Sequence, residues 1–159
     1  MRTILYLALL SFPALAGLGV PDLPAEIMAA LNAQWPGFLV QESEREGANW
    51  EVEIRAADGS EHEVLLDPSG TVLLAFAKAE EQEIPVADLP AAVTAAAQAG
   101  WPGATLLEAE RKGEAYGVEL RTADSQRLEA LFQADGSLIA SAAEGEDDDA
   151  DDADDAEED

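Results

Sequence analysis

The chain contains no cysteine, a single histidine, and only eight lysine and arginine residues among its 159 residues. The absence of cysteine excludes a disulfide framework, a thiolate metal site and a cysteine nucleophile. Because His62 is the single histidine, a metal site with several histidines is excluded and a histidine-based catalytic centre is disfavoured. Glycine-rich phosphate loops and the G-x-S-x-G and H-E-x-x-H motifs are absent as well. These absences predict a protein that is not an enzyme.

Positive charge is scarce, and 34 aspartate and glutamate residues give the chain a formal net charge of −26 at pH 7. Such acidity repels nucleic-acid phosphate and anionic membrane surfaces, and it favours cations or basic partners. Hydrophobic residues nevertheless make up 48% of the chain, which is too much for a wholly disordered protein. Composition and length therefore predict one or two small folded domains that bind no nucleic acid.

The first residues of the chain have the pattern of a secretory signal peptide. Residues 1–16 carry one positive charge at Arg2, then an apolar run, and they end in Ala14-Leu15-Ala16. The apolar run is shorter than the roughly 20 residues that a membrane-spanning helix needs. We therefore expect cleavage after Ala16 and a mature protein that is periplasmic or secreted, with no membrane insertion.

The last residues form an acidic tail. In residues 144–159, twelve of 16 residues are acidic, and none is aromatic or branched aliphatic. Such a segment cannot bury enough apolar surface to offset the entropy lost on ordering. The sequence therefore predicts a disordered tail after the folded part.

A tandem repeat fills the middle of the chain. Residues 20–75 align without a gap with residues 86–141, 66 positions later, and 23 of the 56 positions are identical. Such agreement without an insertion indicates a duplicated unit. The expected organisation is a signal peptide over 1–16, a first repeat over 17–79, a second repeat over 80–143 and the tail over 144–159.

Each repeat has the pattern of one helix followed by a four-stranded meander. Asp22 and Asp88 are expected N-caps, and Pro24 and Pro90 suit the first helical turn. Strand signals follow at about 38–46, 49–57, 60–67 and 71–77, with equivalents 66 residues later. The predicted fold class is α+β, with two tandem αββββ units in which a helix packs on one face of a four-stranded antiparallel sheet.

The repeated motifs resemble those of the PepSY-like proteins, which are related in fold to the secreted β-lactamase-inhibitor protein. The matching residues are Leu23-Pro24, Trp35-Pro36-Gly37, Val52-Glu53-Ile54-Arg55, Asp58-Gly59 and Asp67-x-x-Gly70, with their equivalents in the second repeat. The second repeat departs from the pattern at Asp124-Ser125. The resemblance covers about 20–143 and implies an exported, non-enzymatic domain that binds or inhibits another protein. It supplies no catalytic residue.

Alternation along the strands places an apolar centre within a charged rim on the sheet faces away from the helices. This expected partner-binding surface consists of Leu65, Leu73, Leu131 and Ile139, with Glu53, Arg55, Glu119 and Arg121 around them. An apolar centre with a charged rim is typical of a protein-binding surface, so another exported protein is the expected partner. The sequence leaves open that the two sheets, or a dimer, cover these residues internally.

Cation binding is the alternative function, because dense carboxylates suit Ca²⁺ or another hard cation with several oxygen ligands. In the tail, Asp147, Asp149, Asp151 and Glu158 have the spacing of an EF-hand loop, although Asp152 stands where that loop needs glycine. In the folded part, the repeat preserves four further candidate ligands, Glu42, Glu44, Glu108 and Glu110. No other cofactor is expected.

Overall fold

Two antiparallel sheets and two helices make up the part of the chain that the computed structural model describes, residues 23–143. The predicted signal peptide and acidic tail lie outside these residues. The first half contains α1 (Ala25–Gln34), β1 (Leu39–Glu46), β2 (Asn49–Arg55), β3 (Glu61–Leu66) and β4 (Val72–Ala77). The second half contains η1 (Lys78–Glu80), β5 (Glu81–Ile84), η2 (Val86–Asp88), α2 (Ala91–Gly100), β6 (Thr105–Lys112), β7 (Ala115–Arg121), β8 (Arg127–Gln133) and β9 (Leu138–Ala143). The predicted α+β class is confirmed.

The second sheet has one strand more than the sequence pattern indicates. The sheet orders are β1-β2-β3-β4 and β5-β6-β7-β8-β9. β5 pairs antiparallel with β6, with Ile84 opposite Ala109, and forms the outer edge of the second sheet. Its sequence Glu-Gln-Glu-Ile contains a single apolar residue, so no alternation marks it as a strand. The second half therefore contains the predicted helix and four strands, and departs from the predicted αββββ unit by this additional strand.

Both helices begin two residues later than N-caps at Asp22 and Asp88 would require. The N-cap residues are Pro24 in α1 and Pro90 in α2, and neither helix has a side-chain cap. Asp88 lies in η2, while Asp22 lies outside the described residues. The predicted capping role of Asp88 is therefore wrong.

Each helix covers one face of its own sheet and forms a separate apolar core. In the first half, Ile27 and Leu31 of α1 pack on the sheet residues Val52, Ile54, Val64 and Leu66. In the second half, Val93 and Ala97 of α2 pack on Ala109, Val118, Leu120, Ala130 and Phe132. Burial of a large aliphatic or aromatic side chain contributes about 1.5–3 kcal/mol. The helix-to-sheet contacts therefore stabilise each half.

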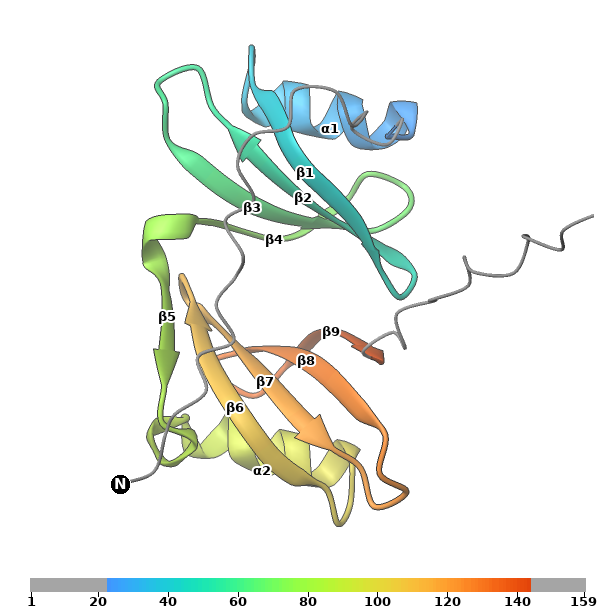
Figure 1. Ribbon diagram of the computed structural model, residues 1–159, viewed down its shortest axis with the longest axis vertical. Coiled ribbons are helices and arrows are strands. Elements are labelled where there is room, and N and C mark those ends of the chain that lie inside the picture. Colours follow the sequence, from blue (N-terminus) through green and yellow to red (C-terminus); the bar gives the residue numbers. More distant parts are fainter. Residues whose placement is uncertain (1–22, 144–159) are drawn as a thin grey trace, which may run out of the picture.

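The helix-free faces of the two sheets are turned toward each other, with α1 above and α2 below them in Figure 1. Leu65 of β3 and Leu131 of β8 are each only 3% exposed although they belong to neither helix-covered core. The second sheet thus covers Leu65, and the first sheet covers Leu131. This is the internal covering that the sequence left open.

The contacts between the halves are reciprocal. Gly47, in the β1–β2 turn, lies against Ala142 of β9, because a Cβ atom at Gly47 would be 3.4 Å from the Cβ of Ala142. Gly113, in the β6–β7 turn, lies against Phe76 of β4 in the same way, at 3.0 Å. Gly113 lies 66 positions after Gly47, and Ala142 lies 66 positions after Phe76, so the two contacts join equivalent residues of the repeats. The duplicated hairpin turns therefore pack on each other's last strand with approximate two-fold symmetry.

A β-bulge changes the side-chain alternation in β4. Leu65 lies opposite Leu74 and Leu66 lies opposite Val72, so Leu73 is the extra residue between them. Residues directly opposite each other in an antiparallel pair have side chains on the same face. Leu74, rather than Leu73, therefore accompanies Leu65 on the helix-free face.

The same bulge occurs in the second sheet. Leu131 lies opposite Ala140, and the register shift makes Ile139 the extra residue of β9. The expected apolar centre is therefore corrected at Leu73 and Ile139, because simple alternation does not allow for an inserted residue.

Gly70 occupies a turn position that an alanine cannot take without clash. Its φ is +85°, and a Cβ atom there would lie 2.6 Å from the carbonyl oxygen of Glu26 in α1. Gly59 has a similar φ of +89°, but no atom lies within 4 Å of its virtual Cβ. We expect Gly59→Ala to lower the free energy of unfolding by about 1 kcal/mol through backbone strain alone. We expect Gly70→Ala to cost at least about twice as much, because the turn must also move away from the helix.

Chemical denaturation of the two variants and the wild type, followed by circular dichroism, measures this difference. Equal losses of stability in the two variants would show that α1 does not hold the Gly70 turn in place.

Candidate functional site

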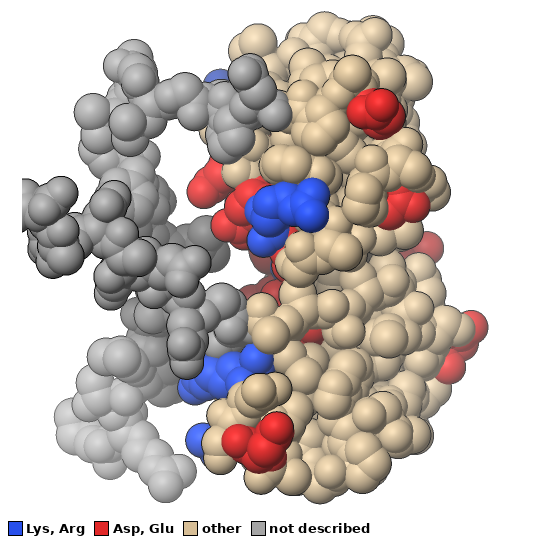
Figure 2. All heavy atoms as spheres, turned by 90° about the vertical axis from the view of Figure 1, so that its right-hand side faces the viewer, with Lys and Arg blue, Asp and Glu red and all other residues tan. Residues whose placement is uncertain are grey.

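Glutamate side chains line a cavity of about 340 Å³ between the helix-free faces of the two sheets. The lining residues are Glu42, Glu44, Glu51, Glu53, Glu63, Lys78, Glu81, Glu110 and Lys112. Figure 2 shows carboxylate groups gathered around the hollow between the two halves. The cavity therefore combines seven carboxylates with two ammonium groups, and these are the only two lysines in the chain.

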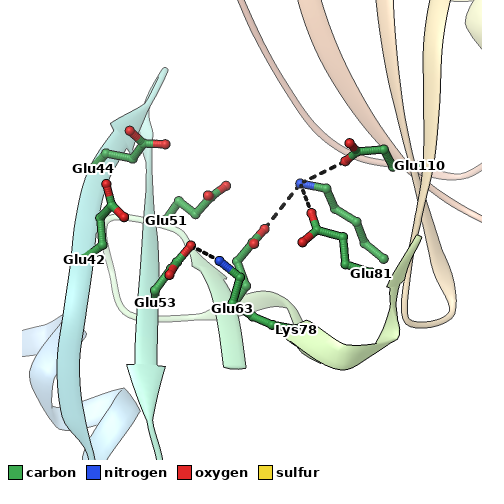
Figure 3. Close-up of a pocket in the computed structure, with 9 residues that line it drawn as sticks. Glu42, Glu44, Glu51, Glu53, Glu63, Lys78, Glu81 and Glu110 are labelled. Atoms are coloured by element: carbon green, nitrogen blue, oxygen red, sulfur yellow. Dashed lines mark hydrogen bonds and ion pairs between the residues drawn. The ribbon is translucent and has the colours of Figure 1, made fainter. Parts of the chain in front are cut away.

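The carboxylates come from both halves of the molecule. In Figure 3, Glu42, Glu44 and Glu51 of β1 and β2 lie on one side of the cavity. Glu81 of β5 and Glu110 of β6 lie on the opposite side. The cavity exists only because the two sheets face each other and bring these side chains together.

Lys112 is the cationic centre of the carboxylate cluster. It is 7% exposed, and its Nζ donates a hydrogen bond to Glu63 Oε1 at 3.3 Å. Three further carboxylates lie close to the same nitrogen: Glu129 at 3.6 Å, Glu81 at 3.9 Å and Glu110 at 3.9 Å. Because Glu63 belongs to β3 and Lys112 to β6, this ion pair joins the two sheets.

The two repeats differ where Lys112 lies. Lys112 is equivalent to Glu46, and Gly117 is equivalent to Glu51. A Cβ atom at Gly117 would lie 3.5 Å from Lys112 Cε and 3.0 Å from Glu129 Oε1. The missing side chain at Gly117 therefore leaves room for the lysine and the glutamate to approach each other.

Burial and mutual repulsion raise the pKa values of several of these glutamates. Burial, together with the neighbouring Glu63 carboxylate, raises the pKa of Glu51 to about 8 against the lowering effect of Lys112. Burial and the Glu129 carboxylate raise the pKa of Glu46 to about 7. Burial also raises the pKa values of Glu63 and Glu110. Part of the cluster therefore holds protons near neutral pH.

The pKa of Lys112 is raised, which keeps its ammonium group charged. Burial by itself lowers this pKa, but the Glu129 and Glu63 carboxylates outweigh burial and raise it above its usual range. Lys112 therefore stays cationic while the surrounding carboxylates titrate.

The predicted metal ligands are only partly brought together. Glu42, Glu44 and Glu110 line the cavity, whereas Glu108 lines a smaller neighbouring cavity of about 90 Å³. The tail ligands Asp147, Asp149, Asp151 and Glu158 lie outside the described residues. Within residues 23–143, no three or more histidine, aspartate or glutamate side chains are arranged to hold a metal ion.

The predicted partner-binding residues are dispersed. Leu65 and Leu131 are buried between the sheets. Glu53 faces the cavity, where it accepts a hydrogen bond from Lys78. Outside the cavity, Arg55 pairs with Glu61 at 2.7 Å, Glu119 pairs with Arg127 at 3.0 Å, and Arg121 is exposed.

Sequence reasoning missed Lys112, Lys78 and the carboxylates Glu51, Glu63 and Glu81 as parts of one site. Glu51 and Glu63 alternate with apolar residues as on a solvated strand face, and alternation shows which face a residue occupies and not what covers that face. One signal was present: Lys112 replaces a glutamate of the other repeat in a chain with two lysines.

Comparisons with known proteins match part of the chain to one family model and leave the partner open. Residues 76–140 match the family model described as "Putative beta-lactamase-inhibitor-like, PepSY-like". The predicted resemblance to PepSY-like proteins is thereby confirmed over most of the second repeat. No curated protein matches the sequence.

Several solved structures are similar to this chain at low identity. A BLIP-like protein from Bacteroides fragilis is 20% identical, with 83% of this chain and 93% of that chain covered and a TM-score of 0.35. A DUF2874 family protein from Bacteroides uniformis is 18% identical, with 76% and 88% covered and a TM-score of 0.35. A "putative calcium-regulated periplasmic protein" from Bacteroides thetaiotaomicron is 22% identical, with 78% and 93% covered and a TM-score of 0.30.

No helix in the described part of the chain is long and apolar enough to cross a membrane.

The raised pKa values predict that stability falls as the pH rises. A carboxyl group with a higher pKa in the folded state than its usual 4.5 stabilises the fold fully below pH 4.5. That contribution is lost as the pH passes through about 7 for Glu46 and about 8 for Glu51. We expect the melting temperature to be highest near about pH 5 and to decline up to about pH 8.5.

Thermal melts across this range, followed by circular dichroism, measure the decline. Glu51→Gln should flatten it, because glutamine copies the protonated form. The control Glu83→Gln changes an exposed glutamate of β5 that does not line the cavity, and it should keep the wild-type slope. An unchanged slope in Glu51→Gln would contradict the assignment.

Loss of Lys112 should destabilise the protein far more than loss of Lys78. Lys112→Met leaves the buried Glu63 carboxylate without its cation, which costs about 3–5 kcal/mol for a buried pair. Lys78 pairs with Glu53 at a more exposed position, so Lys78→Met should cost about 1 kcal/mol or less. Urea denaturation at about pH 8 measures both values, and the Lys112→Met penalty should shrink at about pH 5, where the carboxylates gain protons. Similar penalties for the two variants would show that Lys112 does not hold the sheets together.

Proposed function

We propose that the mature chain is an exported, non-enzymatic binding protein that accepts a cationic group of a partner protein in the acidic cavity. The observation that carries this proposal is the excess of seven carboxylates over two ammonium groups in one cavity. A lysine or arginine side chain of a partner would relieve the repulsion between these carboxylates. The net charge of −26 would attract a basic partner from a distance.

Export is proposed on the pattern of residues 1–16, with its single early arginine, its apolar run and its Ala-x-Ala ending. A non-enzymatic role is proposed on the match of residues 76–140 to a PepSY-like model described as inhibitor-like. The partner is therefore another protein outside the cytoplasm.

A hard cation such as Ca²⁺ is the second candidate ligand. One observation favours it: Glu42, Glu44 and Glu110, three of the four glutamates expected as ligands in the folded part, line the same cavity. Oxygen-rich surroundings suit Ca²⁺, although the described carboxylates do not form a ready coordination shell.

Calorimetric titration of the mature protein with a short oligolysine peptide tests the proposal at about 0.15 M salt, where long-range attraction is largely screened. The double variant Glu42→Gln with Glu44→Gln should weaken binding about tenfold, because it removes two carboxylates from the cavity. The matched control, Glu26→Gln with Glu83→Gln, removes the same charge from exposed positions outside the cavity and should change the affinity less than about twofold.

Equal weakening by the two double variants would contradict a site in the cavity and leave only a net-charge effect. A parallel titration with Ca²⁺ separates the two candidates. Calcium binding that is lost in the cavity variant, with peptide binding unchanged, would favour the cation-binding function.

A further inference from the structure

β4 is an edge strand that carries no charged residue or proline to hinder pairing with a further strand. Among the described strands it pairs only with β3, so backbone groups along its other side face away from the sheet. Its six residues, Val72 to Ala77, contain no charge, no proline and no glycine. Natural edge strands commonly carry lysine, other charged residues or proline, because an unprotected edge recruits further strands.

The outer strands at the opposite ends of the two sheets do carry such protection. β1 has the sequence LVQESERE and β5 the sequence EQEI, so both present charged side chains along their length. The contrast within one molecule indicates that β4 is kept open to pairing, while β1 and β5 are not.

A groove of about 530 Å³ runs beside β4. Residues Val72 to Phe76 form one wall, and the β6–β7 turn with Gly113, Glu114 and Ala115 forms the other. The two walls come close at Gly113 and Phe76, because a Cβ atom at Gly113 would lie 3.0 Å from the Cβ of Phe76. An extended peptide of about six residues matches the length of β4, at about 3.3 Å per residue.

A cavity of different character lies at the end of the equivalent strand β9. β9 is also uncharged, but the cavity of about 250 Å³ at its end is lined by Glu44, Glu46 and Glu51 and belongs to the acidic site. The described cavities beside the two equivalent strands therefore differ: apolar residues of β4 line one, and glutamates line the other.

We propose that β4 is a docking edge that accepts an extended, basic segment of another protein as an additional strand. Main-chain hydrogen bonds to β4 would supply affinity, and the apolar wall would select apolar residues at alternate positions of the segment. The charged groups on the groove are Glu80, Glu114 and Arg111, which leaves a net negative rim. Lysine or arginine beside the apolar positions is therefore the matching chemistry.

Charge decides against a second copy of this chain as the occupant. Pairing of β4 with β4 would bring together two chains that each carry a net charge of −26. The negative charge of the chain attracts a basic segment, whereas it repels a second copy of the chain.

The test uses a fluorescent peptide of about nine residues that alternates valine with lysine or threonine, and a second peptide with the same lysines but with prolines in place of two valines. The first peptide should bind the mature protein and slow amide hydrogen exchange at residues 72–77. The proline peptide should bind at least about tenfold more weakly, because it cannot complete the ladder.

Matched variants locate the site. Ala75 of β4 and Ser141 of β9 are equivalent positions of the repeat, and both are exposed. Ala75→Lys should weaken binding of the first peptide about tenfold, whereas Ser141→Lys adds the same charge and should change it less than about twofold. In the cavity variant Glu42→Gln with Glu44→Gln, the first peptide should still slow amide hydrogen exchange at residues 72–77, which separates docking on β4 from binding in the cavity.

Four outcomes would overturn the proposal. They are equal affinity for the two peptides, equal loss in the two lysine variants, absence of slowed exchange at residues 72–77, and a concentration-dependent dimer of the wild type that Ala75→Lys abolishes. The last outcome would make a second copy the occupant.

Discussion

Lys112 reaches from β6 of the second sheet to Glu63 of β3 in the first, and this ion pair lies at the centre of an otherwise acidic interface. Two sheet faces rich in glutamate repel each other unless a cation or protons lie between them. The chain supplies one buried lysine, and raised pKa values supply protons on Glu46 and Glu51. The way the two halves face each other, and therefore the cavity, depends on this balance of charge.

The interface also shows how a duplicated unit acquires a site that neither copy has alone. Its outer contacts are reciprocal, with Gly47 against Ala142 and Gly113 against Phe76. At the centre the symmetry breaks, because Lys112 stands where the first repeat has Glu46. A fully symmetric glutamate pair would leave the centre without a cation. Divergence at Lys112, together with the room that Gly117 leaves for it, thus places a cation between the two copies while most of the carboxylates remain available to a ligand.

The two surfaces proposed for binding differ in their chemistry. The acidic cavity lies between the inner faces, where charge dominates and water is partly excluded. The β4 strand itself is uncharged, so main-chain hydrogen bonds and apolar contacts would dominate there, within a rim of net negative charge. A basic partner can use both surfaces, because the charge of the whole chain attracts it to either one.

Local pattern was enough to predict the α+β class, the repeat and all strands except β5, since turns and alternation are encoded by neighbouring residues. It failed for Leu73 and Ile139, because a bulge shifts the register without a marker in the sequence. It also failed for the site. Glu51 and Glu63 alternate like solvent-facing residues, and only the docking of the second sheet buries them beside Lys112. By itself, then, the sequence determined the secondary structure, the duplication and the acidic character. The tertiary structure decided which carboxylates meet, because burial and pairing depend on residues of the other repeat.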